Sequence, residues 1–192
     1  MSEGLDAIRR ALEGDPALYE RVVGTDFSWS GRIFTVEQVE VELSDGSRSG
    51  RDLVLHHGGA GVVAVRDGRV CLVRQYRVAL GRTTLEIPAG KVDPDEPRDV
   101  CAARELTEET GLVAERVELL VESYGAPGFT NEHTSVYFAH GLAQGESAPD
   151  EGEFLNVLWL PVDDVIEAIR LGLIDDAKTV MGLLAARAFG ML

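Results

Sequence analysis

The sequence contains few cysteines, few aromatic residues and no long apolar run. Cys71 and Cys101 are too few for a disulfide framework, so we expect two free thiols in the core. No stretch is long and apolar enough to span a membrane, and the N-terminal segment MSEGLDAIRRALEGD carries charges where a signal peptide has an apolar core. These features predict a cytoplasmic protein.

Positive charge is also scarce, since 18 Lys and Arg stand against 33 Asp and Glu, for a formal net charge of -15. Nucleic acids and anionic membranes bind basic surfaces, so neither is an expected partner. An anionic small substrate would need a local cluster of positive charge. With 45% hydrophobic and 27% charged residues, the chain of 192 residues is expected to fold into one sizeable domain, with room for a small extra lobe.

The apolar pattern divides the chain into two parts. Residues 2–13 have a helical pattern, and residues 32–57 alternate apolar and polar side chains around the turn SDG, which is typical of exposed strands. Residues 1–57 are therefore predicted to be an N-terminal lobe of one helix and β-strands. Residues 58–192 are predicted to be the main domain, a layered α/β unit in which strands alternate with helices.

Within the second part, several elements are expected at defined positions. A β-hairpin is predicted around RDGR in residues 58–77, followed by a strand that ends at Pro88 and Gly90. A helix is predicted over residues 96–110, because Asp95 can cap it, Pro97 suits its first turn and Gly111 can end it. Further strands are expected near residues 117–124, 133–140 and 154–160, and two helices near the C-terminus. In the last of these, Val180, Leu183, Leu184 and Ala188 are predicted to share the apolar face.

The helix over residues 96–110 carries three carboxylates close together. Glu105, Glu108 and Glu109 fall within an arc of roughly 100° on one helix face. Arg104 is expected to pair with one neighbour, Glu108, which leaves Glu105 and Glu109 directed at the same space. Carboxylate oxygens without cationic partners suit Mg²⁺ or Mn²⁺, whereas the alternative is an acidic stripe in solvent. We therefore predict a metal site here, to which the backbone carbonyl of Ala89 could add an oxygen.

The segment GKVDPDEPRDVCAARELTEETGL, residues 90–112, resembles the Nudix box. The fixed positions of the box are matched by Gly90, Glu96, Arg104, Glu105, Leu106, Glu108, Glu109, Gly111 and Leu112. The resemblance implies an α/β/α sandwich with a mixed sheet, here preceded by a small N-terminal antiparallel β lobe. It also implies hydrolysis of a nucleoside diphosphate linked to another group, with Mg²⁺ or Mn²⁺ as cofactor.

The resemblance implies a role for each of these side chains. Glu105 and Glu109 would be metal ligands, with Glu108 as an additional ligand and the Ala89 carbonyl completing the set. Arg104 and Glu96 would orient the carboxylates. For Glu96 the alternative is a favourable interaction with the dipole at the start of the helix.

Outside the box, VRQYR, LEIPAGKVD and Pro127 in APGFTNE resemble the ADP-ribose pyrophosphatase branch of the family. This resemblance implies that ADP-ribose is split into AMP and ribose 5-phosphate. It also implies that Arg77 holds a substrate phosphate, that Glu86 contacts the ribose and that Pro127 belongs to the substrate site. Two alternatives stay open: another nucleotide sugar or an oxidised nucleotide as substrate, and a non-catalytic ligand sensor.

The late segment DEGEFLNVLWLP resembles the acidic loop and strand of the branch. Glu151 is assigned as the base for the attacking water and Glu153 as a further metal ligand, with an acidic surface loop as the alternative. In this branch the N-terminal strands exchange between subunits, so the resemblance implies a homodimer built through residues 1–57. Trp29, Phe27 and Phe34 are candidates for stacking on adenine, although each could equally be a core residue of the lobe.

Overall fold

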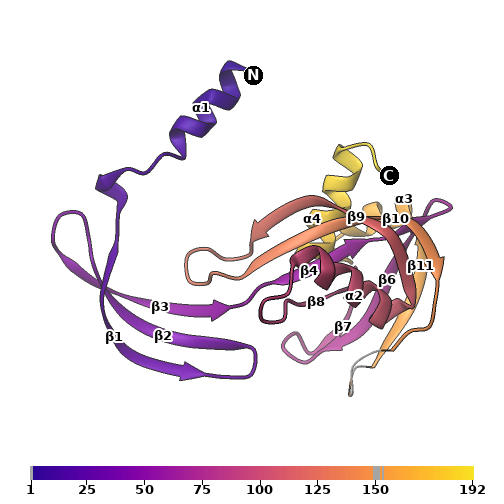
Figure 1. Cartoon of the computed structure of the whole chain (residues 1–192), viewed down its shortest axis with the longest axis horizontal. Coiled ribbons are helices and arrows are strands. Elements are labelled where there is room, and N and C mark those ends of the chain that lie inside the picture. Colours follow the sequence, from indigo (N-terminus) through magenta and orange to yellow (C-terminus); the bar gives the residue numbers. More distant parts are fainter. Residues whose placement is uncertain (1, 149–151, 153) are drawn as a thin grey trace. The chain divides into compact units, whose positions relative to one another are not determined.

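The computed structural model describes residues 2–148, 152 and 154–192, which form two compact units (Figure 1). The first unit contains the chain up to Leu55 together with Gly128–Thr130, and the second contains His56–Pro127 and Asn131–Leu192. Among the described residues, no helix has the length and apolar character needed to cross a membrane.

The first unit contains a helix and a small sheet. Helix α1 (Glu3–Ala11) begins after Ser2, whose hydroxyl oxygen accepts a hydrogen bond from the Leu5 amide. A short 3₁₀ turn, η1 (Pro16–Leu18), leads to strands β1 (Arg21–Ser30), β2 (Phe34–Glu42) and β3 (Arg48–His56), which lie in that order in one sheet. Strand β1, which pairs antiparallel with β2, was not among the predicted strands.

The second unit is built on two sheets. One has the order β8-β4-β10-β9 and contains β4 (Gly59–Val63), β8 (Ala89–Lys91), β9 (Leu112–Tyr124) and β10 (His133–Gln144). The other has the order β11-β6-β5, with β7 also paired to β6, and contains β5 (Val65–Arg66), β6 (Arg69–Arg77), β7 (Arg82–Glu86) and β11 (Leu155–Pro161). Strands β4 and β10 run parallel, whereas β10 and β9 run antiparallel, so the first sheet is mixed as expected.

Three helices cover these sheets: α2 (Arg98–Thr110), α3 (Val162–Arg170) and α4 (Ala177–Ala188). Successive residues of a strand face opposite sides, and on β4 both sides are buried. Val62 lies in one core cluster with Leu106 of α2, and Val63 lies in the other with Leu183 of α4. The sheet is therefore enclosed between α2 and α4, which confirms the predicted α/β/α sandwich.

Both cysteines are free and buried, as predicted, and they belong to the core cluster beneath α2. Burial raises the pKa of the Cys71 thiol and of the Cys101 thiol to about 12. Both groups are therefore uncharged near neutral pH, which fits a packing role.

The predicted hairpin in residues 58–77 is only partly correct. Its turn at Asp67 and Gly68 joins β5 to β6, whereas β4 pairs with β8 and β10 in the other sheet. The chain thus crosses from one sheet to the other between Val63 and Val65. A continuous valine-rich run satisfies a strand buried on both faces as well as a hairpin arm, so periodicity alone does not separate the two.

The predicted start of α2 is also wrong by two residues. The helix begins at Arg98 after Pro97, and Asp95 has a φ of 62° and does not cap it. Glu96 precedes the helix, and its carboxylate accepts a hydrogen bond from the Asp93 amide at 3.1 Å. Glu96 therefore lies in the turn before the helix and not in its first turn.

The buried face of α4 differs from the predicted one. It contains Thr179, Gly182, Leu183 and Ala186, whereas Leu184 is 44% exposed. Because Gly182 packs against Val136 and Val63, the small residues of α4 face the sheet at close range. Size, and not hydrophobicity alone, selects this face.

Candidate active site

The acidic residues of helix α2 lie next to the face of the helix that is buried against the sheet. Cys101, Ala102 and Leu106 are fully buried against the sheet, and Gly111 ends the helix with a φ of 72°, a left-handed conformation that suits glycine. Glu109, on the same turn as Leu106, is only 4% exposed. A buried carboxylate requires polar partners, so the surroundings of these acids decide what they can do.

Arg104 connects the acidic residues of this region. Its Nε donates to Glu96 Oε1 at 2.8 Å, and its Nη1 donates to Glu105 Oε1 and to Glu108 Oε2, each at 2.8 Å. The expectation that Arg104 pairs with Glu108 alone, leaving Glu105 without a cation, is therefore wrong. A guanidinium carries five N–H donors in a planar fork, so a single arginine can hold several carboxylates.

The hydrogen bonds and charges of this cluster shift the pKa values of Glu96 and Arg104. The hydrogen bond from Arg104 is the main reason that the pKa of Glu96 falls to about 2. Hydrogen bonds to Glu96, Glu108 and Glu105, with the charge of Glu105, raise the pKa of Arg104 although burial opposes this. Glu96 and Arg104 therefore stay ionised across the neutral range.

Strand β8 approaches the acidic face of α2 closely. The Ala89 amide donates to Glu109 Oε2 at 3.0 Å. A Cβ atom at Gly90 would collide with the carboxylate of Glu105, so glycine is needed for this side chain to lie against the backbone. Ala89 and Gly90 are thus brought together with Glu105 and Glu109, as the sequence predicted.

These residues fit a hard divalent cation in the chemistry of their donors. Three carboxylates from one helix and the backbone of β8 supply only oxygen atoms, which Mg²⁺ and Mn²⁺ prefer. Within residues 2–148, 152 and 154–192, no three His, Cys, Asp or Glu side chains are arranged as a ready metal-binding group. Arg104 donates to Oε1 of Glu105 and to Oε2 of Glu108, and a carboxylate can accept from an arginine through one oxygen while its second oxygen holds a cation.

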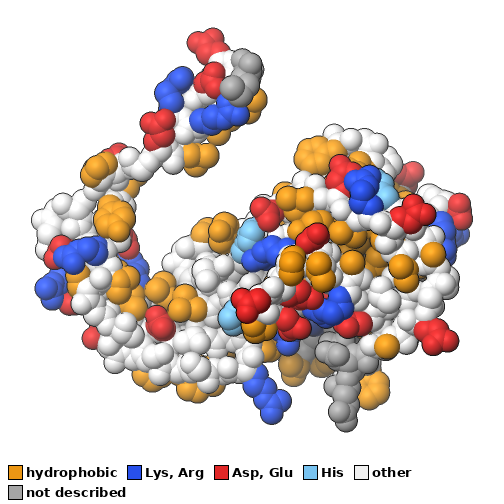
Figure 2. Space-filling model, viewed as in Figure 1, with side chains coloured by type: hydrophobic (Ala, Val, Ile, Leu, Met, Phe, Trp, Pro, Cys, Tyr) orange, Lys and Arg blue, Asp and Glu red, His pale blue; other side chains and the backbone are white. Residues whose placement is uncertain are grey.

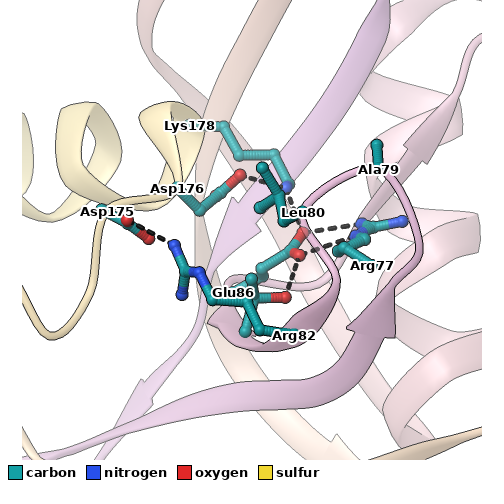
Figure 3. A pocket seen from close by; sticks show the side chains of 9 residues that line it. Arg77, Ala79, Leu80, Arg82, Glu86, Asp175, Asp176 and Lys178 are labelled. Carbon is teal, nitrogen blue, oxygen red and sulfur yellow. Dashed lines mark hydrogen bonds and ion pairs between the residues drawn. The ribbon is translucent and has the colours of Figure 1, made fainter.

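A second group of polar residues lines a hollow of about 350 Å³ in the same unit (Figure 3). Its lining residues come from β6, β7, the loop between them and the start of α4: Arg77, Ala79, Leu80, Arg82, Thr84, Glu86, Asp175, Asp176 and Lys178. Arg77 Nε and Nη2 donate to the two oxygens of Glu86, both at 2.7 Å. This bidentate pair fixes the plane of the guanidinium.

Glu86 is buried, with only 2% of the residue exposed. It accepts hydrogen bonds from Arg77 and from Thr84 Oγ1, the latter at 2.6 Å, and forms an ion pair with Lys178. Burial pushes the pKa of Glu86 upward, but the bonds from Arg77, Lys178 and Thr84 outweigh burial and hold it at about 2. Glu86 is therefore a buried, ionised residue of the core and not an exposed strand glutamate.

The hollow and the acidic helix are within electrostatic reach of each other. The pKa of Arg77 is raised mainly by its hydrogen bond to Glu86, and the charges of Asp176 and Glu109 add to the effect. Arg74 has a different role, since it is exposed and donates to Asn156 Oδ1 at 2.7 Å on the neighbouring strand β11. Arg77, but not Arg74, lines the hollow.

Neither Pro127 nor the three aromatic candidates belong to these two groups. Pro127 is exposed in a turn after β9. Glu151 and Glu153 lie outside the described residues. In the first unit, Trp29 and Phe34 contact each other with ring centroids 6.0 Å apart, and Phe27 is 48% exposed.

Sequence reasoning missed Thr84, Asp176 and Lys178. Lys178 lies 92 residues from Glu86 along the chain, so no local pattern connects them. The only signal is the pair Asp175 and Asp176 before a helix, where an aspartate is a common cap.

Known proteins resemble this chain over most of its length. Residues 55–181 match the NUDIX domain. The chain is 37% identical over 167 residues to the methanol dehydrogenase activator of Bacillus methanolicus, covering 85% of this chain and 90% of the relative. It is 35% identical over 170 residues to the ADP-ribose pyrophosphatase of Bacillus subtilis (strain 168), covering 87% and 92%.

A solved structure described as an ADP compounds hydrolase has a TM-score of 0.80 with this chain at 24% sequence identity, covering 92% of this chain and 96% of the other. At that identity the match shows a shared fold. The fold, the acidic face of α2 and the relatives agree, and the chain belongs to the NUDIX domain family, as residues 90–112 predicted.

Proposed function

We propose that this Nudix hydrolase splits the diphosphate of ADP-ribose into AMP and ribose 5-phosphate, with Mg²⁺ or Mn²⁺ as cofactor. The observation that carries the proposal is the docking of the acidic face of α2 on Ala89 and Gly90, with Arg77 within electrostatic reach. Relatives named as ADP-ribose pyrophosphatases, at 35% and 36% identity, support the choice of substrate.

In this proposal, Glu105, Glu108, Glu109 and the Ala89 carbonyl hold the metal, and Glu153 adds a ligand. When bound, the ion supplies neutralisation of the diphosphate charge and Lewis acidity at a phosphoryl oxygen. Arg104 and Glu96 keep the carboxylates in place through their mutual hydrogen bonds. Because the chain has a net charge of -15, an anionic substrate depends on such local compensation.

Arg77 is the residue that we assign to a substrate phosphate. Its Nε and Nη2 are bonded to Glu86, and Nη1 has no hydrogen-bond partner among the residues that the structure describes. A planar guanidinium with one edge held and another available is suited to a phosphate. Hydrolysis would then proceed by in-line attack of water on one phosphorus, with Glu151 accepting the proton and the other phosphate leaving.

The experiment that tests the proposal is incubation with a panel of dinucleotides and nucleotide sugars in the presence of Mg²⁺, with the products identified by mass. AMP and ribose 5-phosphate from ADP-ribose are expected at the highest kcat/KM. Faster cleavage of another nucleotide sugar or an oxidised nucleotide would replace the substrate. If no compound is cleaved but binding is retained, the protein is a ligand sensor. This second candidate is included because one relative is named as an activator of another enzyme.

The metal assignment is tested in the same assay with Glu109→Gln. Glutamine keeps an oxygen that can accept from the Ala89 amide, so we expect folding to be retained while turnover falls by about 100-fold or more. The exposed residue Glu115 on β9 gives a matched control, since Glu115→Gln should leave turnover unchanged. Full activity of Glu109→Gln at saturating Mg²⁺ would refute the ligand assignment.

We further propose that the protein is a cytoplasmic homodimer in which residues 1–57 form the dimerisation lobe. Apolar side chains on the surface of the first unit support an interface there, among them Leu12 at 81% and Trp29 at 51% exposure (Figure 2). Light scattering coupled to size exclusion tests this proposal: a single species of twice the chain mass is expected, and a monomer at micromolar concentration would contradict it.

A further inference from the structure

We propose that Lys178, in the first turn of α4, is a positioning residue for the substrate phosphate, because it fixes Glu86 and through it Arg77 (Figure 3). This inference rests on the proposed function of Arg77. It assigns to Glu86 a different role from the predicted contact with ribose.

The hydrogen bonds of Glu86 support this role. An ionised carboxylate offers about four acceptor sites. In Glu86 they receive Arg77 Nε, Arg77 Nη2, Thr84 Oγ1 and Lys178 Nζ. Glu86 would have to give up one of these bonds to accept a ribose hydroxyl, so its arrangement suits holding cations and not binding sugar.

Lys178 is itself held in place. Its Nζ donates to Asp176 Oδ1 at 2.8 Å as well as to Glu86, and its side chain is only 18% exposed. Asp176 is in turn fixed as the cap of α4, since its other oxygen accepts from the Thr179 amide at 3.0 Å and from Thr179 Oγ1 at 2.5 Å. Lys178 therefore links the carboxylate of Glu86 to the start of α4.

The same turn is tied to the strand that leads into the acidic site. The Ile87 amide donates to Thr179 Oγ1 at 2.9 Å, next to Glu86 and two residues before Ala89. The first turn of α4 therefore contacts both Glu86 and the backbone that follows it. Arg77 lies at the end of β6, and 41% of its side chain is exposed. Its orientation therefore depends on the bonds to Glu86. A long side chain at a strand end is otherwise free to adopt many rotamers.

The charges give a reason for a lysine at this position. Glu86 and Asp176 together balance the charges of Arg77 and Lys178, so without Lys178 this group would carry a net negative charge. A buried carboxylate shared by two cations leaves Arg77 more able to attract an anion. Removing Lys178 should therefore weaken phosphate binding in two ways, through the orientation of Arg77 and through its effective charge.

The inference is tested by steady-state kinetics with ADP-ribose on Lys178→Met, which removes the charge and keeps most of the side-chain volume. We expect KM to rise about tenfold with a smaller change in kcat, and Lys178→Arg to recover part of the loss. Arg74→Met is the matched control, because Arg74 lies on the same strand as Arg77 but is exposed and donates to Asn156 outside the hollow. Its KM should stay within about twofold of the wild type.

A double-mutant cycle with Arg77→Met separates positioning from direct contact. If Lys178 acts through Arg77, Lys178→Met should add little to the loss already caused by Arg77→Met. A full tenfold effect of Lys178→Met in the Arg77→Met background, or an unchanged KM in the wild-type background, would overturn the proposal. If Lys178→Met does not fold, the double variant Glu86→Gln/Lys178→Met replaces it, because residue 86 is then no longer a buried anion that needs a cation. The same rise in KM is expected for the double variant.

A binding measurement keeps this test independent of the substrate assignment. The affinity for inorganic pyrophosphate, measured by calorimetry with Mg²⁺, should fall in Lys178→Met and not in Arg74→Met. If the wild type does not cleave ADP-ribose but this difference is found, the proposed substrate fails and the role of Lys178 stands. Equal pyrophosphate affinity of wild type and Lys178→Met would refute the role of Lys178 whatever the substrate.

Discussion

At the scale of single residues, Gly90 determines where the Glu105 carboxylate lies. A methyl group on this residue would occupy the space of that carboxylate. The obstructed group is the end of a flexible side chain, so Gly90→Ala should displace Glu105 without unfolding the domain. We expect the free energy of unfolding to change by less than about 1 kcal/mol and turnover to fall at least about tenfold.

Chemical denaturation and steady-state kinetics check both parts of this expectation. Gly125→Ala serves as a control, because a Cβ atom there would meet nothing within 4 Å. Unchanged turnover in Gly90→Ala would mean that the position of Glu105 does not matter for the reaction.

Glu86 provides a second prediction at this scale, which concerns pH. Its pKa in the folded chain is about 2, against an ordinary value of 4.5. A lowered pKa stabilises the folded state above the ordinary value, and this contribution is lost as the pH falls from 4.5 toward 2. The lost contribution amounts to about 3 kcal/mol for this buried carboxylate.

Glu86→Gln removes this titration. The variant should be less stable than the wild type near pH 7, and the difference in the free energy of unfolding should narrow as the pH falls through this range. Urea denaturation at a series of pH values measures it. A difference that stays constant from pH 7 to pH 3 would contradict the assigned pKa.

The sequence predicted the residues of α2 well and their partners less well. Glu105, Glu108 and Glu109 share a face because helix geometry alone requires it. The several bonds of Arg104 depend on Glu96, which lies in a turn outside the helix, so the local pattern could not reveal them. Lys178 was missed for the same reason, since its contact with Glu86 is made only by the folded chain.

At the scale of elements, Gly111 ends α2 and allows the chain to continue into β9. It has a φ of 72°, and a Cβ atom would lie 2.9 Å from the Gly145 carbonyl oxygen. Gly111→Ala should therefore lose the free energy of a left-handed alanine, about 1–2 kcal/mol, and more because of the close backbone contact.

The control is Gly172, which follows α3 with a φ of 71° and would meet nothing within 4 Å. In urea denaturation, Gly172→Ala should show only the conformational loss, and Gly111→Ala a larger one. Equal losses in the two variants would mean that the contact with Gly145 relaxes without cost.

Element type was predicted more reliably than element pairing. The valine-rich run after Gly58 was correctly read as strand, but its pairing partners were not, because β4 joins β8 and β10 instead of turning back on β6. Alternation and turn residues report on neighbours in the chain, whereas pairing with β10 depends on the packing of α2 and α4 on both faces of β4.

At the scale of the whole molecule, the excess of negative charge is the dominant electrostatic feature. With a formal net charge of -15, repulsion among carboxylates opposes the compact state. Exposed ion pairs such as Arg21 with Glu42 contribute little against it. Raising KCl from about 20 mM to about 200 mM should therefore raise the thermal midpoint by about 2–4 °C.

Thermal denaturation monitored by circular dichroism measures this effect. The gain should shrink near pH 5, where part of the carboxylates is protonated. A midpoint that falls with added KCl at pH 7 would show that attractive ion pairs outweigh the repulsion.

The parallel pairing of β4 with β10 also has a consequence for synthesis of the chain. Gly59 pairs with Thr134 and Val63 with Phe138, so the central sheet cannot form until β10 has left the ribosome. Before that point β4 and α2 have emerged with their apolar faces uncovered, and contacts between distant segments form slowly. Nascent chains halted before His133 should therefore be bound by chaperones, and those extended past α4 should be released.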